Sequence, residues 1–276
     1  MVTFLALAAA VLAGTGDFFG GKATKKTNVV SVLAISHFLG LIIILILAPL
    51  MADEFTSKDF FLGVLASSFG LCGLTLLYRG LAKGPMAIVA PITAVACAAL
   101  PVIWGLLSGE KLSAVQIAGV FVGLLAIFLV SWTPGERKAI KGSLVLEALV
   151  AGLSFGAFFI VIDGTSETTA PWPVVGSRVF SVLVIFLFVI IGRRNIKPEK
   201  NSTPFIVGAG FFDTLANVVL LAALNKGLLS LVSVLASFYP AVTVLLARFF
   251  LKEMMLKNQI IGLALGLTSI ALLATS

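Results

Sequence analysis

Residues 110–127 read EKLSAVQIAGVFVGLLAI, and residues 253–270 read EMMLKNQIIGLALGLTSI. Aligned without a gap at a separation of 143 residues, both stretches carry Glu, Gln, two glycines and Ile at the same places. The Lys-Gly pairs at 83–84 and 226–227 keep the same separation. Identities at a fixed separation are the mark of an internal repeat. The chain is therefore expected to consist of two related halves.

The composition is that of a membrane protein. Of the 276 residues, 60% are apolar and 11% are charged, and the mean hydropathy is +1.16. Soluble domains carry about 25% charged residues, so a soluble globular protein is excluded. A spanning helix needs about 20 apolar residues. Apolar runs separated by charged residues, Gly or Pro predict ten spans, at 2–21, 28–50, 60–81, 84–107, 113–132, 143–163, 171–192, 203–225, 228–251 and 257–275.

The repeat and the spans together predict the fold class. Five spans per half is an odd number, so the second half must enter the membrane in the opposite sense, as in many secondary transporters. We expect an all-α integral membrane protein of ten transmembrane helices, arranged as two inverted five-helix repeats. The predicted domains are a first repeat at 1–132, a linker at 133–142 and a second repeat at 143–276.

The net charge of +7 is explained by basic residues at the membrane edges. Fifteen of the 19 Lys and Arg residues follow the odd-numbered spans and three follow the even-numbered ones, with Arg178 inside a span. Since cytoplasmic loops are enriched in Lys and Arg, this bias places both chain ends outside the cell. Nucleic acid is not an expected partner. The start lacks a basic segment, so the first helix is not expected to be a cleaved signal peptide.

Other chemistry has little support in the sequence. The two cysteines, Cys72 and Cys97, lie in apolar runs, and zinc needs about four clustered ligands. We therefore expect neither a metal site nor a disulfide. The sequence has no Gly-rich Lys-Ser/Thr loop for a nucleotide, and we expect no cofactor, no catalytic residue and no enzymatic activity.

Charged and polar residues inside the spans are the candidate substrate-binding residues. A charge at the centre of a span costs about 2.5–3.5 kcal/mol, so those retained usually face the bundle interior. Five residues qualify: Asp17, His37, Arg178, Asp213 and Asn217. A carboxylate or the histidine is expected to bind a proton or a substrate amine, and Arg178 to bind a carboxylate. The alternatives are a structural ion pair between Arg178 and Asp213 and a satisfied core histidine.

A second group of candidates surrounds prolines in the fourth and ninth spans, at Pro91, Pro101 and Pro240. Prolines expose backbone groups that can line a cavity. Nearby hydroxyl and aromatic groups complete the predicted substrate-binding set: Tyr78, Ser233, Ser237 and Tyr239. The alternative is that these residues are ordinary kinks and interfacial anchors.

Two further motifs indicate packing. Glu110 and Glu253 stand at helix ends and are predicted to cap helices or to lie in an interface. The small-residue motifs at 119–123 and 262–266 have the spacing Gly-x-x-x-Gly, which allows close helix contact. We expect the fifth span to pack on the tenth, or a dimer contact.

The stretches 78–85 (YRGLAKGP) and 237–243 (SFYPAVT), with the Glu motifs at 109–111 and 252–253, resemble the EamA family of the drug/metabolite transporter superfamily. The resemblance covers the whole chain as two repeats. It implies a ten-helix carrier of small metabolites, often an exporter, with a central cavity between the halves. Members are usually drawn with both ends in the cytoplasm, opposite to the charge bias. They often carry an arginine in the second helix, where this chain has His37.

We therefore expect a secondary active transporter, in the cell membrane, that exports small organic metabolites such as amino acids by alternating access. Its partners would be the substrate, the bilayer and protons, and it would be a monomer or a homodimer. The alternative is a lipid-handling protein such as a flippase, or an intramembrane aspartyl protease. The sequence Gly-Thr-Gly-Asp at 14–17 matches the GxGD motif of those proteases, but no aspartate follows a tyrosine as their second motif requires.

Overall fold

The computed structural model describes residues 1–83, 86–132, 142–193, 195–252 and 254–274, without the side chains of 78–88, 90 and 91. Within these ranges the chain is α-helical and has no strand. The helices are α1 (Val2–Thr24), α2 (Val29–Met51), α3 (Ser57–Lys83), α4 (Met86–Leu107), α5 (Ala114–Ser131), α6 (Gly142–Asp163), α7 (Trp172–Ile191), α8 (Thr203–Leu224), α9 (Leu229–Ala236), α10 (Tyr239–Leu251) and α11 (Lys257–Leu273).

Eight segments of the described residues are long and apolar enough to cross a membrane. Two shorter apolar helices, Ile92–Leu107 and Lys257–Leu273, fall in the fourth and tenth predicted spans. The ninth span, Leu229–Leu251, is apolar and long enough to cross a membrane, but it is broken at Ser237 and Phe238 into α9 and α10. Pro240 in the first turn of α10 accounts for the break, because its ring clashes with a helical carbonyl four residues earlier. By contrast, α4 runs unbroken through Pro101.

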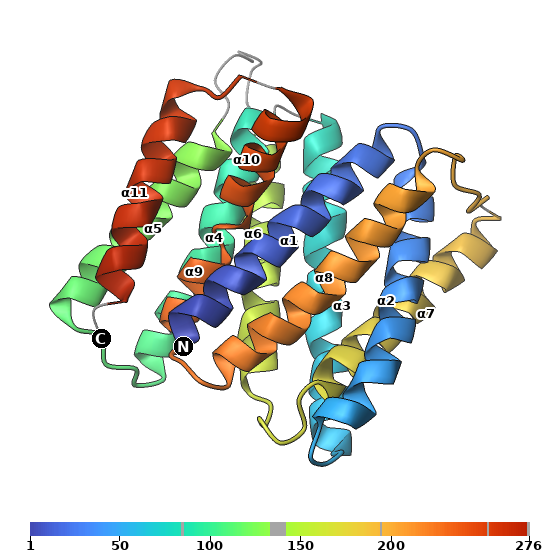
Figure 1. Cartoon of the computed structure of the whole chain (residues 1–276), viewed down its shortest axis with the longest axis horizontal. Coiled ribbons are helices and arrows are strands. Elements are labelled where there is room, and N and C mark those ends of the chain that lie inside the picture. Colours follow the sequence, from blue (N-terminus) through green and yellow to red (C-terminus); the bar gives the residue numbers. More distant parts are fainter. Residues whose placement is uncertain (84–85, 133–141, 194, 253, 275–276) are drawn as a thin grey trace.

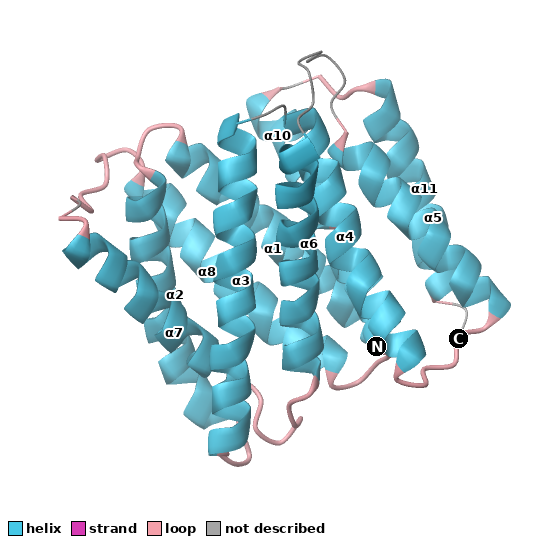
Figure 2. Ribbon diagram, turned by 180° about the vertical axis from the view of Figure 1, so that it is seen from behind, coloured by secondary structure: helices cyan, strands magenta, loops and turns pink. Residues whose placement is uncertain are grey.

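The helices form two layers that meet along their edges. α1, α8 and α10 face the viewer in Figure 1, and α3 and α6 face the viewer from behind in Figure 2. α1 packs on α8 in one layer, and α3 packs on α6 in the other. The layers contact each other where α2 packs on α7 at one edge and α5 on α11 at the other. Between these edges, α9 packs on α4.

Glycines bring α5 and α11 together, as the sequence predicted. A Cβ atom on Gly262 would lie 2.8 Å from the Val130 nitrogen and 3.0 Å from the Ala126 oxygen. A Cβ atom on Gly119 would lie 2.9 Å from Leu273. Both glycines therefore face the partner helix, and the small-residue motifs are packing motifs.

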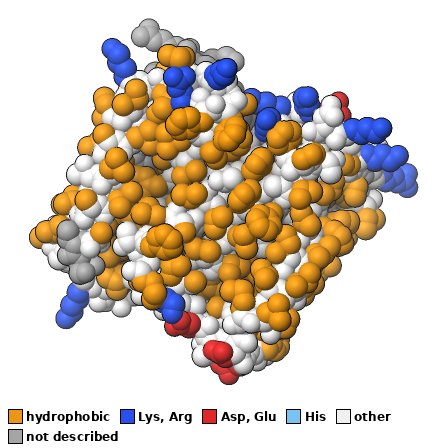
Figure 3. Space-filling model, in the orientation of Figure 1, with side chains coloured by type: hydrophobic (Ala, Val, Ile, Leu, Met, Phe, Trp, Pro, Cys, Tyr) orange, Lys and Arg blue, Asp and Glu red, His pale blue; other side chains and the backbone are white. Residues whose placement is uncertain are grey.

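The two ends of the bundle differ in charge. We call the end where α1 begins and α11 ends the terminus side, and the opposite end the basic side. In Figure 3 most of the visible Lys and Arg side chains lie along the edge opposite the chain ends, and most of the visible acidic side chains lie at the terminus side. The basic side carries the exposed residues Lys25, Lys26, Arg193, Lys197 and Lys200. The terminus side carries Asp53 and Glu54. The loop charges counted from the sequence are thus separated in space.

Candidate functional site

An ion pair between α7 and α8 forms the centre of the candidate site. Arg178 Nη2 donates to Asp213 Oδ2, with the arginine side chain 6% exposed and the aspartate side chain 47% exposed. Arg178 is seven residues into α7, and Asp213 lies at the middle of α8. Burial of a guanidinium requires a paired charge, and Asp213 supplies it. The structure therefore brings together two of the predicted site residues.

His37 joins this pair from α2. Arg178 Nη1 lies 3.3 Å from His37 Nδ1, and Ser181 Oγ lies 2.9 Å from the same nitrogen. A guanidinium only donates hydrogen bonds, so the contact with Arg178 needs an Nδ1 that carries no proton, whereas the contact with Ser181 can run in either direction. Ser181 Oγ donates to the Arg178 carbonyl oxygen at 3.1 Å. Ser181 was not predicted from the sequence, although it lies one turn after Arg178 and is 2% exposed.

Glycines allow the helices around the pair to approach closely. A Cβ atom on Gly40 would lie 3.4 Å from Arg178 Nε, and one on Gly210 would lie 2.5 Å from the Ser36 carbonyl oxygen. A Cβ atom on Gly16 would lie 3.2 Å from the Asp213 nitrogen. Gly16 precedes Asp17 on α1, so the backbone around Asp17 lies against the helix that carries Asp213.

Asp17 differs from the paired residues in its surroundings. Its side chain is exposed, although it lies inside the apolar helix α1. Within the part of the chain that the structure describes, it has no hydrogen-bond or ion-pair partner. It lies within electrostatic range of Asp213, which is itself half exposed. Two accessible carboxylates inside spans favour a water-filled path beside α1 and α8.

The remaining predicted residues lie at different distances from this cluster. Asn217 Nδ2 donates to the Asp213 carbonyl oxygen at 2.8 Å, so its amide is held one turn from the ion pair. Tyr239, at the start of α10, lies within electrostatic range of Asp17. Tyr78 is in α3, but its side chain lies outside the described residues.

Ser233 and Ser237 are buried in α9 and its C-terminal end, each 0% exposed. Ser237 lies beside the Cys97 thiol. Among the contacts of the described residues, neither serine touches the cluster around Arg178. The Ser233 hydroxyl oxygen is buried and has no hydrogen-bond partner among the described residues, so a movement of α9 would make it available to a ligand.

Glu110 has the capping role predicted from the sequence. Its carboxylate accepts hydrogen bonds from the backbone nitrogen of Leu229 at 2.6 Å and of Ser230 at 3.2 Å. These are the first two residues of α9, so Glu110 caps a helix of the opposite half. Glu253, the matching glutamate, lies outside the described residues.

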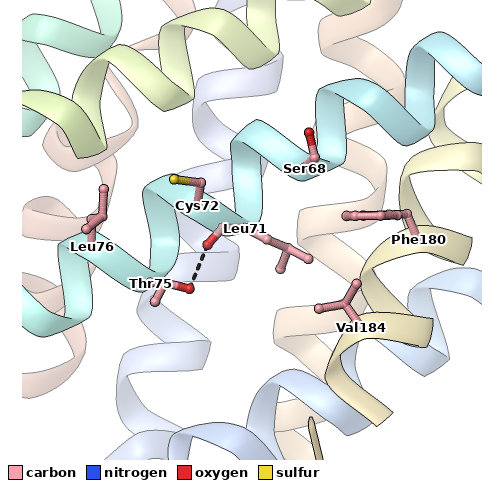
Figure 4. Close-up of a pocket in the computed structure, with 7 residues that line it drawn as sticks. All are labelled: Ser68, Leu71, Cys72, Thr75, Leu76, Phe180 and Val184. Atoms are coloured by element: carbon pink, nitrogen blue, oxygen red, sulfur yellow. Dashed lines mark hydrogen bonds between the residues drawn. The ribbon is translucent and has the colours of Figure 1, made fainter. Parts of the chain in front are cut away.

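A groove of about 360 Å³ between α3 and α7 is a separate feature. Figure 4 shows its lining, which is Ser68, Leu71, Cys72, Thr75, Leu76, Phe180 and Val184. Its hydroxyls are engaged within their own helix: Thr75 Oγ1 donates to the Leu71 carbonyl oxygen at 2.8 Å. The groove thus offers an apolar surface of the kind that faces lipid, and the described candidate residues lie elsewhere.

The cluster can bind charged groups. Arg178 and Asp213 neutralise each other, whereas Asp17 contributes a carboxylate without a partner among the described residues. An accessible carboxylate can accept a proton or pair with an organic ammonium group, and the Tyr239 ring offers an aromatic face for a cation. An aspartyl protease needs two carboxylates that share a proton. The commitment of Asp213 to Arg178 argues against that arrangement.

Comparisons with known proteins agree with this architecture. A model of the EamA-like transporter family matches residues 1–132 and 142–275. An uncharacterized protein of Methanocaldococcus jannaschii is 28% identical over 135 residues, which are 49% of this chain and 97% of that protein. A solved crystal structure superposes with a TM-score of 0.81 at 15% identity, covering 99% of this chain and 96% of that chain. At this identity the structural likeness shows the fold alone.

Proposed function

The chain belongs to the EamA-like transporter family, and we propose that it exports small organic metabolites, such as amino acids or related compounds, by alternating access. Family membership and the apolar helices make it a multi-pass membrane transporter of the drug/metabolite type. The proposed substrate class rests on one observation, the polar cluster of Asp17, His37, Arg178 and Asp213 inside the spans. The energy source in this proposal is a proton gradient or a substrate gradient.

Related features on opposite sides of the bundle support two inverted repeats of five spans, at 1–132 and 143–276, joined by a linker at 133–142. Thr27 and Thr169 lie 142 residues apart in the sequence. On the basic side, Thr27 Oγ1 accepts from the Glu199 nitrogen at 3.1 Å. On the terminus side, Thr169 Oγ1 donates to Asp59 Oδ2 at 2.6 Å. Each threonine thus ties its loop to the other half, at opposite ends of the molecule.

Helix pairing and the half-length relative support the same arrangement. The first helix of each half packs on the third helix of the other, as α1 on α8 and α6 on α3. The second helices pair as α2 and α7, and the last helices pair as α5 and α11. The M. jannaschii relative is matched over 97% of its length by 135 residues, so a related chain has about the length of one proposed repeat.

In the proposed cycle, the two halves rock around the polar cluster and expose it to one side of the membrane at a time. Asp17 binds the ammonium group of the substrate or a proton. The Arg178–Asp213 pair, steadied by His37, interacts with the remaining polar group of the substrate. Tyr78, Asn217, Ser233, Ser237 and Tyr239 complete the proposed binding surface. A flippase or an aspartyl protease is less well supported, because the family is one of transporters.

The charge separation supports a placement in the cell membrane with the basic side in the cytoplasm. We predict that a cysteine introduced at Lys200, which is exposed on the basic side, reacts with a membrane-impermeant maleimide only after the cells are opened. A cysteine at Asp53, exposed on the terminus side, should react in intact cells. The reverse pattern would invert the orientation.

The proposed function is tested by counterflow in proteoliposomes that contain the purified protein. Pools of amino acids, nucleobases, sugars and organic cations are compared, with and without an imposed pH gradient. We expect saturable exchange of a pool that carries amines, faster when the gradient is present. If no pool exchanges under either condition, the metabolite-exporter proposal fails and lipid flipping becomes the function to test.

A further inference from the structure

We propose that α9 is the gate that closes the transport path on the terminus side, and that Glu110 is the positioning residue that holds it shut. The proposal rests on the alternating-access function argued above. It explains how the path opens and closes, whereas the cluster around Arg178 explains which substrate binds.

Burial distinguishes the two halves of the broken ninth span. All eight residues of α9 are buried, whereas Ala241 is the one buried residue of α10. α9 packs against α1, α4, α5, α6 and α8. It therefore fills the middle of the bundle on the terminus side, where Gly227 at its entry packs against Val2. α10 continues toward the basic side with partly exposed residues next to Asp17. α9 is thus enclosed by the bundle, whereas α10 is partly exposed.

Glu110 holds the outer end of α9. The two backbone nitrogens that it caps, those of Leu229 and Ser230, lie at a helix N-terminus, where unpaired N–H groups and the helix dipole favour a carboxylate. Ser230 Oγ also donates to the Val102 carbonyl oxygen of α4 at 3.3 Å. These contacts join the end of α4 in the first half to the start of α9 in the second.

The backbone before Glu110 adopts the geometry that this contact needs. Gly109 has φ of +97°, in the left-handed region that favours glycine. The matching residue of the second half, 143 positions later, is Lys252, with φ of +57°. A left-handed turn at a lysine is uncommon, so both halves keep the turn even where the residue type disfavours it. A left-handed residue therefore follows the end of the fourth span in both halves.

In the proposed cycle the two halves move relative to each other, so the Glu110 cap, which joins them, forms in one state and breaks in the other. Any opening of the terminus side that separates α4 from α9 must break the bonds from Glu110. The carboxylate therefore biases the protein toward the state sealed on this side. Opening α9 would also uncover the unpartnered Ser233 hydroxyl.

The test is the rate at which an impermeant maleimide, applied from the terminus side, labels a cysteine at Ser233 in a background without the two natural cysteines. We expect Glu110→Ala to raise the labelling rate by about five-fold or more, the shift given by loss of one helix cap. Glu110→Gln keeps one acceptor oxygen and should raise the rate at least about two-fold. Size-exclusion profiles identify which variants fold.

The matched control is Ser113→Ala. Ser113 caps α5 within its own half, accepting from the Gln116 nitrogen at 3.2 Å, so its loss weakens a helix without freeing α9. We expect its labelling rate to equal that of the parent. An unchanged labelling rate in a Glu110 variant that elutes as a single folded species would overturn the gate. An equal rise in the labelling rate with Ser113→Ala would overturn it as well. Counterflow is measured on the parent protein, because Ser233 belongs to the proposed binding surface. Altered labelling with no counterflow of any pool by the parent would support the gate while refuting the metabolite exporter. Counterflow by the parent with unaltered labelling would refute the gate alone.

Discussion

Replacing Arg178 with alanine is expected to abolish measurable counterflow and to lower the thermal stability of the purified protein. The guanidinium is 6% exposed and is bonded to both Asp213 and His37. Its removal leaves the Asp213 carboxylate unpaired inside a span. Because that carboxylate is 47% exposed, water offsets part of the cost. We expect a loss of about 1–3 kcal/mol in unfolding free energy and a fall in transport of at least about 100-fold.

A neutral double variant separates the two roles of the pair. Arg178→Gln combined with Asp213→Asn removes both charges, so no unpaired charge remains in the span. We expect its melting temperature to recover toward that of the parent while counterflow stays absent. Recovery of both stability and transport would identify the pair as structural, which was the alternative reading of the sequence. Arg178→Lys keeps the charge without the planar fork and should give intermediate transport.

The broad class of the protein and its helical content were predictable from the sequence because they depend on local composition. The predicted apolar runs fall on helices of the described residues, and eight segments are long enough to span a membrane. The small-residue motifs at 119–123 and 262–266 correctly predicted the packing of α5 on α11. Aligning the two halves of the sequence also matches His37 with Arg178, at a separation of 141 residues. The structure places these two side chains in contact across α2 and α7.

The contacts of the individual site residues could not be predicted, because they depend on which helices are neighbours in space and the spacing of residues along the sequence does not show this. Position in the sequence did not distinguish Asp17 from Asp213. In the structure Asp213 pairs with Arg178, whereas Asp17 has no hydrogen-bond or ion-pair partner among the described residues. It marked Glu110 as a cap without indicating that the capped helix belongs to the other half. Ser181 carried no distinguishing pattern, because a serine in an apolar helix is common and its role comes from the helix opposite.

Replacing Asp17 with asparagine is expected to remove transport with little effect on stability, in contrast to the loss of Arg178. Asparagine has nearly the same shape, and the carboxylate is exposed and has no partner within the described residues, so no native contact is lost. We expect the unfolding free energy to change by less than about 0.5 kcal/mol. Counterflow should fall at least about 10-fold, because the amide cannot bind a proton or pair with an ammonium group. The measurement is counterflow of the pool that the parent protein exchanges.

The matched control is Asp53→Asn, which removes one exposed carboxylate on the terminus side and should leave transport unchanged. The response to an imposed pH gradient then decides what Asp17 binds. If residual exchange in Asp17→Asn no longer accelerates with the gradient, Asp17 carries the coupling proton. If the acceleration persists at the reduced rate, Asp17 binds the substrate amine and the proton binds elsewhere. Transport equal to that of the parent would exclude Asp17 from both roles, because a neutral amide can perform neither.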